Sequence, residues 1–258
     1  NMVIIGGGYI GLEVAAVSRK LGLSVTVVEM ASRILERVTS PVISSFYHSY
    51  HESQGVEIMT STSVNGINGD LNVSSVETSS GTIEADIVVV GIGVLPCQNL
   101  AEKAGIETNN GIVVNEFCIS SDSNVFSAGD CTLHPSAFYK RDIRLESVHN
   151  AIEQGKTVAS SIMEEFVPYN QIPWFWSDQY NLKFQIAGLN NDYDEYIVRG
   201  RPEDNSFSVF YFKDGFMISS DCVNSAPEHM MSRRFIFNRA EVDLEKLQNK
   251  EISIKEVI

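Results

Sequence analysis

The sequence has no long apolar run. No stretch approaches the roughly 18 consecutive apolar residues that a membrane-spanning helix needs, and the longest candidate, residues 87–95, is broken by glycine and sized for a strand. Asn1 and Met2 lead directly into an apolar strand pattern, so we expect no secretory leader. These absences predict a soluble protein that does not enter the membrane, and we expect it in the cytoplasm.

Basic residues are scarce as well. The chain has 19 Lys and Arg against 33 Asp and Glu, which gives a formal net charge of −14 over 258 residues. Nucleic-acid binding relies on Lys and Arg to neutralise phosphates, so this balance argues against a nucleic-acid partner. An acidic protein partner stays possible, because a small basic patch can lie on an acidic molecule.

Only four cysteines are present, and no two of them form a C-x-x-C pair. A zinc ribbon or a thioredoxin-like redox pair is therefore not expected. His48 and His51 lie three positions apart on a predicted helix, and we interpret them as surface residues rather than metal ligands, so no metal site is predicted. We interpret the four cysteines as small buried hydrophobic residues of a protein in a reducing compartment. They are Cys97, Cys118, Cys131 and Cys222.

The apolar pattern predicts an α/β fold. A short strand at residues 3–5 opens into a glycine turn and a helix, and a second strand at 24–29 completes a right-handed βαβ unit with a parallel sheet. One face of that helix carries apolar residues at helical spacing, namely Ile10, Val14, Val17 and Leu21. The elements expected next are a helix from Pro41 to Gly55, a strand at 56–59, an antiparallel excursion over 64–85 and a fully buried strand at 87–90.

The second half of the chain shows a different pattern of predicted helices and strands. A proline-containing linker at 167–173 follows a long helix expected at about 148–165. The other expected elements are a short helix at 100–104, a strand at 112–114, strands near 183–188, 194–199, 206–212 and 216–223, and a helix from Pro227.

The glycine turn has the spacing of a dinucleotide-binding turn. Gly6 permits the tight turn, Gly8 lets a pyrophosphate approach the backbone, and Gly11 allows the helix to pack closely on the strand. The helix N-terminus adds amide donors and a positive dipole end. Glu29, which is 29 − 6 = 23 positions after the first glycine, ends the second strand, where a carboxylate binds an adenosine ribose and repels a 2′-phosphate. The pattern therefore predicts NADH rather than NADPH.

Five segments together resemble a known family. They are VIIGGGYIGLEVAA, ADIVVVGIGVLP, VFSAGDC, RLESVHNAIEQGK and PWFWSDQYNLKFQIAGL, in this order. Essentially the whole chain is similar to the single-chain ferredoxin and rubredoxin reductases of the pyridine nucleotide-disulfide oxidoreductase superfamily, and PWFWSDQ is the most discriminating piece. The resemblance implies an NAD-binding domain at 1–95, the second half of an FAD-binding domain at 96–172, and a smaller C-terminal α+β domain at 173–258. Because the family carries a separate glycine turn for FAD ahead of this region, we expect no FAD pyrophosphate cradle here.

The resemblance also implies roles for individual residues. NADH would be held at its pyrophosphate by Gly6, Gly8, Tyr9, Ile10 and Gly11, at its adenosine by Glu29 and Arg37, and at its nicotinamide end by Glu13, Gly91, Ile92 and Gly93. FAD would be contacted at its ribityl chain by Gly129 and Asp130, at its pyrimidine edge by Val148, and where electrons leave by Trp176.

The residues alone leave other interpretations open. Asp130 also fits a turn cap, Arg37 a solvated charge, and Glu13 a charge near a helix dipole. Trp176 and its neighbour Trp174 also fit an ordinary core.

The activity implied by the resemblance is hydride transfer from NADH to FAD, followed by single-electron transfer to a small iron–sulfur ferredoxin or to a rubredoxin. No catalytic side chain is assigned, because positioning and cofactor electronics carry such a reaction. Two alternatives remain: another superfamily member, such as an NADH oxidase or an apoptosis-inducing-factor-like protein, and an NAD-binding fragment without enzyme activity.

We expect this chain to bind NADH and not to hold FAD tightly, because it has one dinucleotide turn. Purified protein should quench or shift NADH fluorescence on titration and should show no visible flavin absorbance. Flavin absorbance that co-purifies with this polypeptide would contradict the expectation.

Overall fold

The computed structural model describes residues 1–258, and its first part is built on a four-stranded parallel sheet. The strands lie in the order β3-β2-β1-β7, with bounds β1 Met2–Ile5, β2 Val25–Val28, β3 Val56–Met59 and β7 Ile87–Val90. Helix α1 (Tyr9–Lys20) connects β1 to β2, and α2 (Pro41–Ser53) connects β2 to β3. The expected βαβ unit is confirmed.

A three-stranded antiparallel sheet links β3 to β7, as expected for residues 64–85. Its strands are β4 (Val64–Gly69), β5 (Val73–Thr78) and β6 (Gly81–Glu84), paired in chain order. A small apolar cluster joins this sheet to the parallel one through Val3, Val28, Val76 and Ala85.

One expectation about burial is wrong. Strand β7 is not fully buried, because it is the edge of its sheet and pairs only with β1; Ile87 and Val90 are 45% and 56% exposed. On α1, the apolar face that predicts the helix is largely exposed at Ile10, Val17 and Leu21, whereas the buried positions are Gly11, Leu12, Ala15, Ala16 and Ser18. Small residues dominate the buried side because α1 lies close to the sheet, and close packing leaves little room for side chains.

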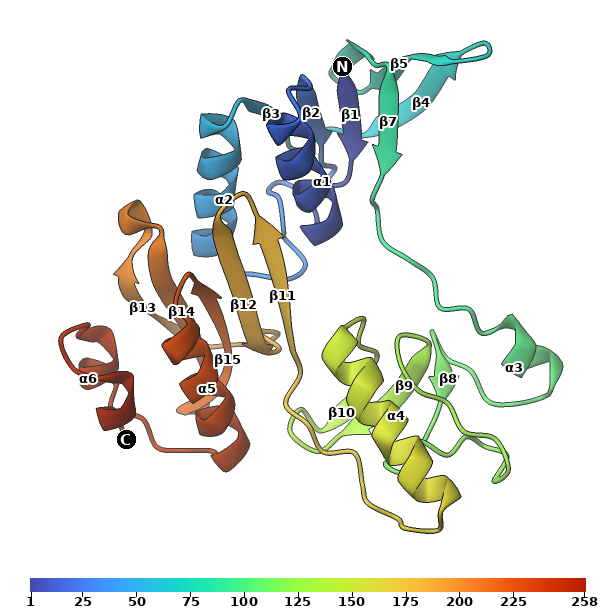
Figure 1. Cartoon of the computed structure of the whole chain (residues 1–258), viewed down its shortest axis with the longest axis vertical. Coiled ribbons are helices and arrows are strands. Elements are labelled where there is room, and N and C mark those ends of the chain that lie inside the picture. The colour runs from blue at the N-terminus through green and yellow to red at the C-terminus, as the bar shows by residue number, and fades with distance from the viewer.

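The middle of the chain forms a separate lobe, joined to the rest by extended segments on either side (Figure 1). It contains α3 (Asn99–Lys103), a sheet in the order β10-β9-β8, and the long helix α4 (Val148–Ile162). The strand bounds are β8 Ile112–Val113, β9 Thr132–Ser136 and β10 Arg141–Ile143, of which only β8 was predicted.

The four cysteines differ in exposure. Cys118 and Cys222 are buried as expected, whereas Cys97 is exposed and Cys131 is half-buried.

The C-terminal part is a five-stranded antiparallel sheet with helices. Its strand order is β11-β12-β15-β14-β13, and α5 (Ala226–Asn238) packs on β15. The strands are β11 Trp174–Gln179, β12 Leu182–Gly188, β13 Glu195–Arg201, β14 Ser206–Lys213 and β15 Phe216–Val223, and α6 Leu244–Gln248 lies near the end. The last four strands and α5 confirm the sequence prediction. Strand β11 was not predicted. No helix anywhere in the chain has the length and apolarity needed to cross a membrane.

The parallel-sheet part and the C-terminal sheet share one apolar core. The largest buried cluster joins Leu12, Ile34 and Tyr47 from the first to Phe184 and Phe207 from the second. These side chains are almost completely buried. Apolar burial of this kind is the main stabilising term in folding, so it fixes the two parts against each other.

A buried carboxylate lies in the same interface. Asp221 on β15 accepts hydrogen bonds from the hydroxyls of Thr39 and Tyr211, and the Tyr211 hydroxyl also contacts that of Ser40, 2.8 Å away. Ser40 precedes α2, but its side chain makes no capping hydrogen bond and instead hydrogen-bonds with the Tyr211 hydroxyl. Burial raises the pKa of Asp221 to about 6, although the hydrogen bonds from Thr39 and Tyr211 oppose the shift.

This carboxylate should make stability depend on pH. A folded-state pKa above the unfolded value means that the native state binds more protons between about pH 4 and pH 6, so stability falls as pH rises through that window. For wild type, the loss from this group should be on the order of 3 kcal/mol. Asp221→Asn should remove that component, which urea unfolding of both proteins at several pH values would reveal. Parallel pH profiles for the two proteins would contradict the assignment.

Candidate functional site

The glycine turn brings three chain segments into backbone contact. Gly6 has φ +111°, and a Cβ there would lie 2.4 Å from the carbonyl oxygen of Gly91. A Cβ on Gly11 would lie 2.1 Å from the carbonyl oxygen of Gly6. Both positions therefore require glycine, and together they pack the end of β1 against the start of α1 and the end of β7.

Gly8 differs from its neighbours, because a Cβ at this position would meet no atom within 4 Å. The backbone here is extended, with φ −82°, so any residue could adopt it. Glycine at Gly8 therefore leaves open space above the start of α1. The first-turn amides of a helix lack partners within the helix and carry its positive dipole end, so this space suits an anionic group such as a pyrophosphate.

Glu29 is fixed beside this open space. Its carboxylate accepts a hydrogen bond at Oε2 from the Gly7 amide at 2.7 Å and at Oε1 from the Ala31 amide at 2.8 Å. Two amide donors hold the carboxylate in one orientation. An oriented carboxylate next to a helix N-terminus can accept hydrogen bonds from sugar hydroxyls.

Other predicted NADH residues lie around the turn. The Arg37 guanidinium reaches the carbonyl oxygen of Ile92 at 3.5 Å, which joins the loop after β2 to the end of β7. The Tyr9 side chain points away from the open space: its ring packs on Phe175 and Phe184 at centroid distances of 5.5 and 5.9 Å. Only the backbone of Tyr9 is therefore available to a ligand.

Glu13 lies one helical turn beyond Tyr9 and faces β11. Its carboxylate Oε1 accepts a hydrogen bond from the Ser177 hydroxyl at 2.6 Å, and no other hydrogen bond from the protein reaches it. Ser177 follows Trp176 directly on β11. Glu13 thus connects the first part of the chain to the strand that carries the exposed tryptophan.

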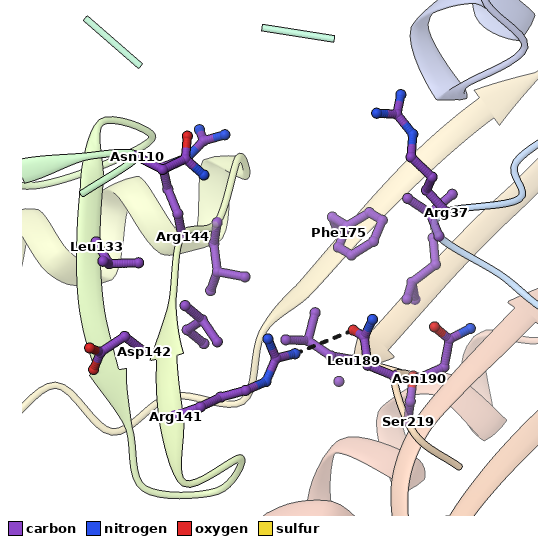
Figure 2. A pocket seen from close by; sticks show the side chains of 16 residues that line it. Arg37, Asn110, Leu133, Arg141, Asp142, Arg144, Phe175, Leu189, Asn190 and Ser219 are labelled. Carbon is purple, nitrogen blue, oxygen red and sulfur yellow. Dashed lines mark hydrogen bonds between the residues drawn. The ribbon is translucent and has the colours of Figure 1, made fainter. Parts of the chain in front are cut away.

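A cavity of about 410 Å³ opens between the middle lobe, the loop after β2 and the C-terminal sheet. Figure 2 shows Arg37 on one side of it, Arg144 and Asn110 on the other, and Arg141 hydrogen-bonded to Asn191. The lining is rich in cations, in contrast to the acidic chain as a whole. It shares Arg37 with the residues around the glycine turn but does not include the turn itself.

The Gly129–Asp130 turn is held by a buried polar network. The Gln154 side chain on α4 accepts hydrogen bonds at Oε1 from the Gly129 amide at 2.7 Å and from the Thr132 hydroxyl at 2.8 Å. Its Nε2 lies 3.0 Å from Nδ1 of His134, whose pKa burial lowers to about 4. The neutral ring therefore accepts at Nδ1. This network orders the turn and leaves the Asp130 side chain exposed.

The start of α4 lies close to the tryptophans of β11. Val148, its first residue, is 56% exposed, and the preceding Ser147 caps the helix by accepting from the Asn150 amide. The ring of His149 lies 5.4 Å from that of Trp174, which in turn lies 5.6 Å from that of Trp176. Trp176 is 45% exposed. An exposed indole beside the positive end of a helix is suited to a planar, electron-rich ring.

The predicted residues thus gather in two groups. Around the glycine turn lie Gly6, Gly8, Tyr9, Ile10, Gly11, Glu13, Glu29, Arg37, Gly91, Ile92 and Gly93. On or next to the middle lobe lie Gly129, Asp130, Val148 and Trp176. No three His, Cys, Asp or Glu side chains gather in an arrangement suited to a metal ion.

Sequence reasoning missed several buried polar residues at the site. Gln154 is one, and Ser177 and Gln179 on β11 are others. His51 was expected on the surface, but it is completely buried and its Nε2 lies 2.8 Å from Oε1 of Gln179. Its partner is 128 positions away in the sequence, so no local pattern reveals the contact. The two-residue spacing of Ser177 and Gln179 is the one signal in the sequence that would place them on a common face of a strand.

This combination of a dinucleotide turn on a parallel sheet and an antiparallel C-terminal sheet defines a class of flavin- and nicotinamide-dependent oxidoreductases. The chain belongs to the pyridine nucleotide-disulphide oxidoreductase family, whose model matches residues 1–155. A second model, the reductase C-terminal domain, matches residues 174–258. The family resemblance expected from the sequence is confirmed.

Individual relatives agree with the family. The chain is 41% identical to putidaredoxin reductase of Pseudomonas putida, across 100% of this chain and 62% of that protein. It is 39% identical to rhodocoxin reductase of Rhodococcus erythropolis, across 99% of this chain and 60% of the relative. The structure matches that of a covalent putidaredoxin reductase–putidaredoxin complex with a TM-score of 0.96 and 40% identity, covering 99% of this chain and 62% of the other. The chain therefore spans about 60% of the length of these relatives.

Gly8 and Gly11 should respond differently to the same substitution. Gly11→Ala forces a Cβ against the Gly6 carbonyl and should destabilise the protein by about 1–3 kcal/mol. Gly8→Ala adds a methyl group in open space and should change stability by no more than about 0.5 kcal/mol. Thermal unfolding of both variants measures this difference. Equal destabilisation would contradict the geometry of the turn.

Proposed function

We propose that this chain supplies the NADH site and the electron-exit end of a flavoprotein reductase that passes electrons from NADH, through FAD, to a ferredoxin or rubredoxin type carrier. The observation that carries the proposal is the open space above Gly8, flanked by the oriented carboxylate of Glu29. The names of the relatives support the carrier class.

NADH binding rests on the backbone around the turn. The amides of Gly8, Tyr9, Ile10 and Gly11 would hold the pyrophosphate, because they begin α1 and have no partners within it. Glu29 would accept hydrogen bonds from the adenosine ribose. A 2′-phosphate would lie against its negative charge, so NADH is preferred over NADPH.

The remaining NADH contacts follow from the arrangement around β1. Arg37, in the loop beyond Glu29, would lie against the adenosine. On the other side of β1, Gly91, Ile92 and Gly93 at the end of β7 would receive the nicotinamide. Glu13, whose carboxylate keeps an oxygen without a protein partner, would accept a hydrogen bond from the nicotinamide carboxamide.

The flavin contacts that this chain provides lie on the middle lobe and β11. Asp130, exposed on a turn that Gln154 orders, would accept hydrogen bonds from the ribityl hydroxyls. The start of α4 at Val148 would place the helix dipole at the pyrimidine edge, where it stabilises negative charge. FAD, when bound, accepts a hydride and releases single electrons. The residues of this chain bind and orient, and none of them is required to transfer a proton.

Trp176 marks the proposed exit for electrons. It is exposed and belongs to an aromatic group with Trp174, His149 and His229. The Arg233 guanidinium lies over the Trp174 ring, 4.9 Å from its centroid, and gives this surface a local positive charge within an acidic chain. A small acidic carrier would be attracted to such a surface despite the net charge of −14.

The NADH site can be tested with two matched glycine substitutions. Gly8→Ala should weaken NADH binding by at least about tenfold, because the added methyl group occupies the space that the pyrophosphate needs. Gly155→Ala on α4 also adds a methyl group where no atom lies within 4 Å, but away from the turn, and should leave NADH affinity unchanged. Isothermal titration calorimetry measures both. Unchanged affinity in Gly8→Ala would place NADH elsewhere.

The electron-transfer function needs a second experiment. A fusion of this chain with the part of putidaredoxin reductase that it does not cover should bind FAD and reduce a ferredoxin or a rubredoxin in the presence of NADH. Trp176→Ala should slow carrier reduction while leaving NADH-dependent bleaching of the flavin unchanged. Negligible reduction of both carriers by a flavin-loaded fusion would refute the carrier assignment and favour an NADH oxidase.

A further inference from the structure

Strand β11 presents two different faces. Residues alternate along it, so that Trp176 and Asp178 are exposed while Ser177 and Gln179 are completely buried against α1 and α2. The exposed face belongs to the proposed electron exit. The two buried polar residues have no part in that function, although they belong to PWFWSDQ, the most discriminating piece of the family resemblance.

The buried polar residues form a continuous chain of hydrogen bonds that ends at Glu13. Ser177 Oγ lies 2.6 Å from Glu13 Oε1, and Gln179 Nε2 lies 3.0 Å from Ser177 Oγ. His51 Nε2 lies 2.8 Å from Gln179 Oε1, and the Tyr180 hydroxyl lies 3.4 Å from His51 Nδ1. These hydrogen bonds thus run from α2, through β11, to α1, the helix that follows the dinucleotide turn.

Only one direction of donation satisfies every group in this series of hydrogen bonds. An ionised carboxylate can only accept, so Ser177 donates to Glu13 and must itself accept from the amide NH₂ of Gln179. The amide oxygen of Gln179 then accepts from Nε2–H of His51, which leaves Nδ1 as an acceptor for Tyr180. A neutral ring is required, and burial does lower the pKa of His51. Hydrogen bonds that all point the same way strengthen one another.

Glu13 lies where this series of hydrogen bonds can affect the binding of a ligand. It is one helical turn past Tyr9, the first residue of α1, and its Oε2 receives no hydrogen bond from the protein. The bond from Ser177 fixes the carboxylate through Oε1 and leaves Oε2 to accept from an amide donor. A nicotinamide carboxamide carries such a donor.

We propose that Ser177 and Gln179 are positioning residues that hold the Glu13 carboxylate in the orientation required by the carboxamide of NADH. This inference rests on the proposed NADH site. It assigns to β11 a role in nicotinamide binding on one face, in addition to the electron exit on the other.

The test separates the nicotinamide half of the ligand from the rest. ADP-ribose contains the adenosine and pyrophosphate of NADH but lacks the nicotinamide. Ser177→Ala should weaken NADH binding about tenfold, the size expected for losing one hydrogen bond to a charged group. Its affinity for ADP-ribose should stay within about twofold of wild type, since the groups at Gly8 and Glu29 are untouched. Calorimetric titration of this chain with both ligands gives the two ratios.

Two serine variants serve as controls. Ser177→Thr keeps the hydroxyl and should restore most of the NADH affinity. Ser208→Ala removes another fully buried serine hydroxyl of the same sheet, one without a hydrogen-bond partner, and should alter neither affinity. Equal losses for NADH and ADP-ribose in Ser177→Ala, or no loss for either, would overturn the inference.

A measurement on the wild-type chain keeps the inference testable if Ser177→Ala fails to fold. Nitrogen-15 spectra should show His51 protonated at Nε2 and not at Nδ1. Adding NAD⁺ should shift the His51 and Gln179 side-chain signals, whereas adding ADP-ribose should not. Identical responses to the two ligands would overturn the inference. If neither ligand binds at all, the proposed NADH site itself is wrong.

Discussion

The structure depends first on the close approach of three backbone segments at the glycine turn. Gly6 and Gly11 leave no room for a side chain where β1, α1 and β7 meet, since a Cβ at either position would lie within 2.4 Å of a carbonyl oxygen. This contact sets the direction of α1, and α1 in turn sets what β11 can reach. Four residues of a helix advance about 6 Å and two residues of a strand about 6.6 Å, so successive turns of α1 meet alternate residues of β11. Tyr9 meets Phe175 and Glu13 meets Ser177 in this way.

The parts of the fold that the sequence predicts well are those fixed by local patterns. The glycine turn, Glu29 and helix α2 depend on neighbours within a few residues or on one βαβ unit, and they lie where expected. The exposed face of α1 and the edge position of β7 depend on what covers them, which spacing alone does not reveal. Strand β11 lacks a clean apolar alternation because its buried face carries Ser177 and Gln179, whose partners Glu13 and His51 are 164 and 128 positions away.

The C-terminal sheet is more than an attachment to a dinucleotide-binding unit. Its buried contacts include an apolar cluster shared with α1 and α2 and a carboxylate, Asp221, bonded to Thr39 from the loop that also carries Arg37. Polar groups buried at an interface tolerate few alternative arrangements, because each lost partner is costly. The buried face of β11 contacts α1 next to the glycine turn, and its exposed face carries Trp176. This one strand therefore holds the two sides of the site at a fixed separation.

The edge position of β7 has a consequence for how the chain behaves at high concentration. Its four apolar residues offer unpaired backbone groups on one side, and an open edge of this kind is a template for pairing with another molecule. Mutual repulsion between chains of net charge −14 opposes that pairing at low ionic strength. Salt shortens the range of the repulsion to about 10 Å at 0.1 M. Colloidal stability is thus an electrostatic property of this chain, set by the acidic surface rather than by the edge itself.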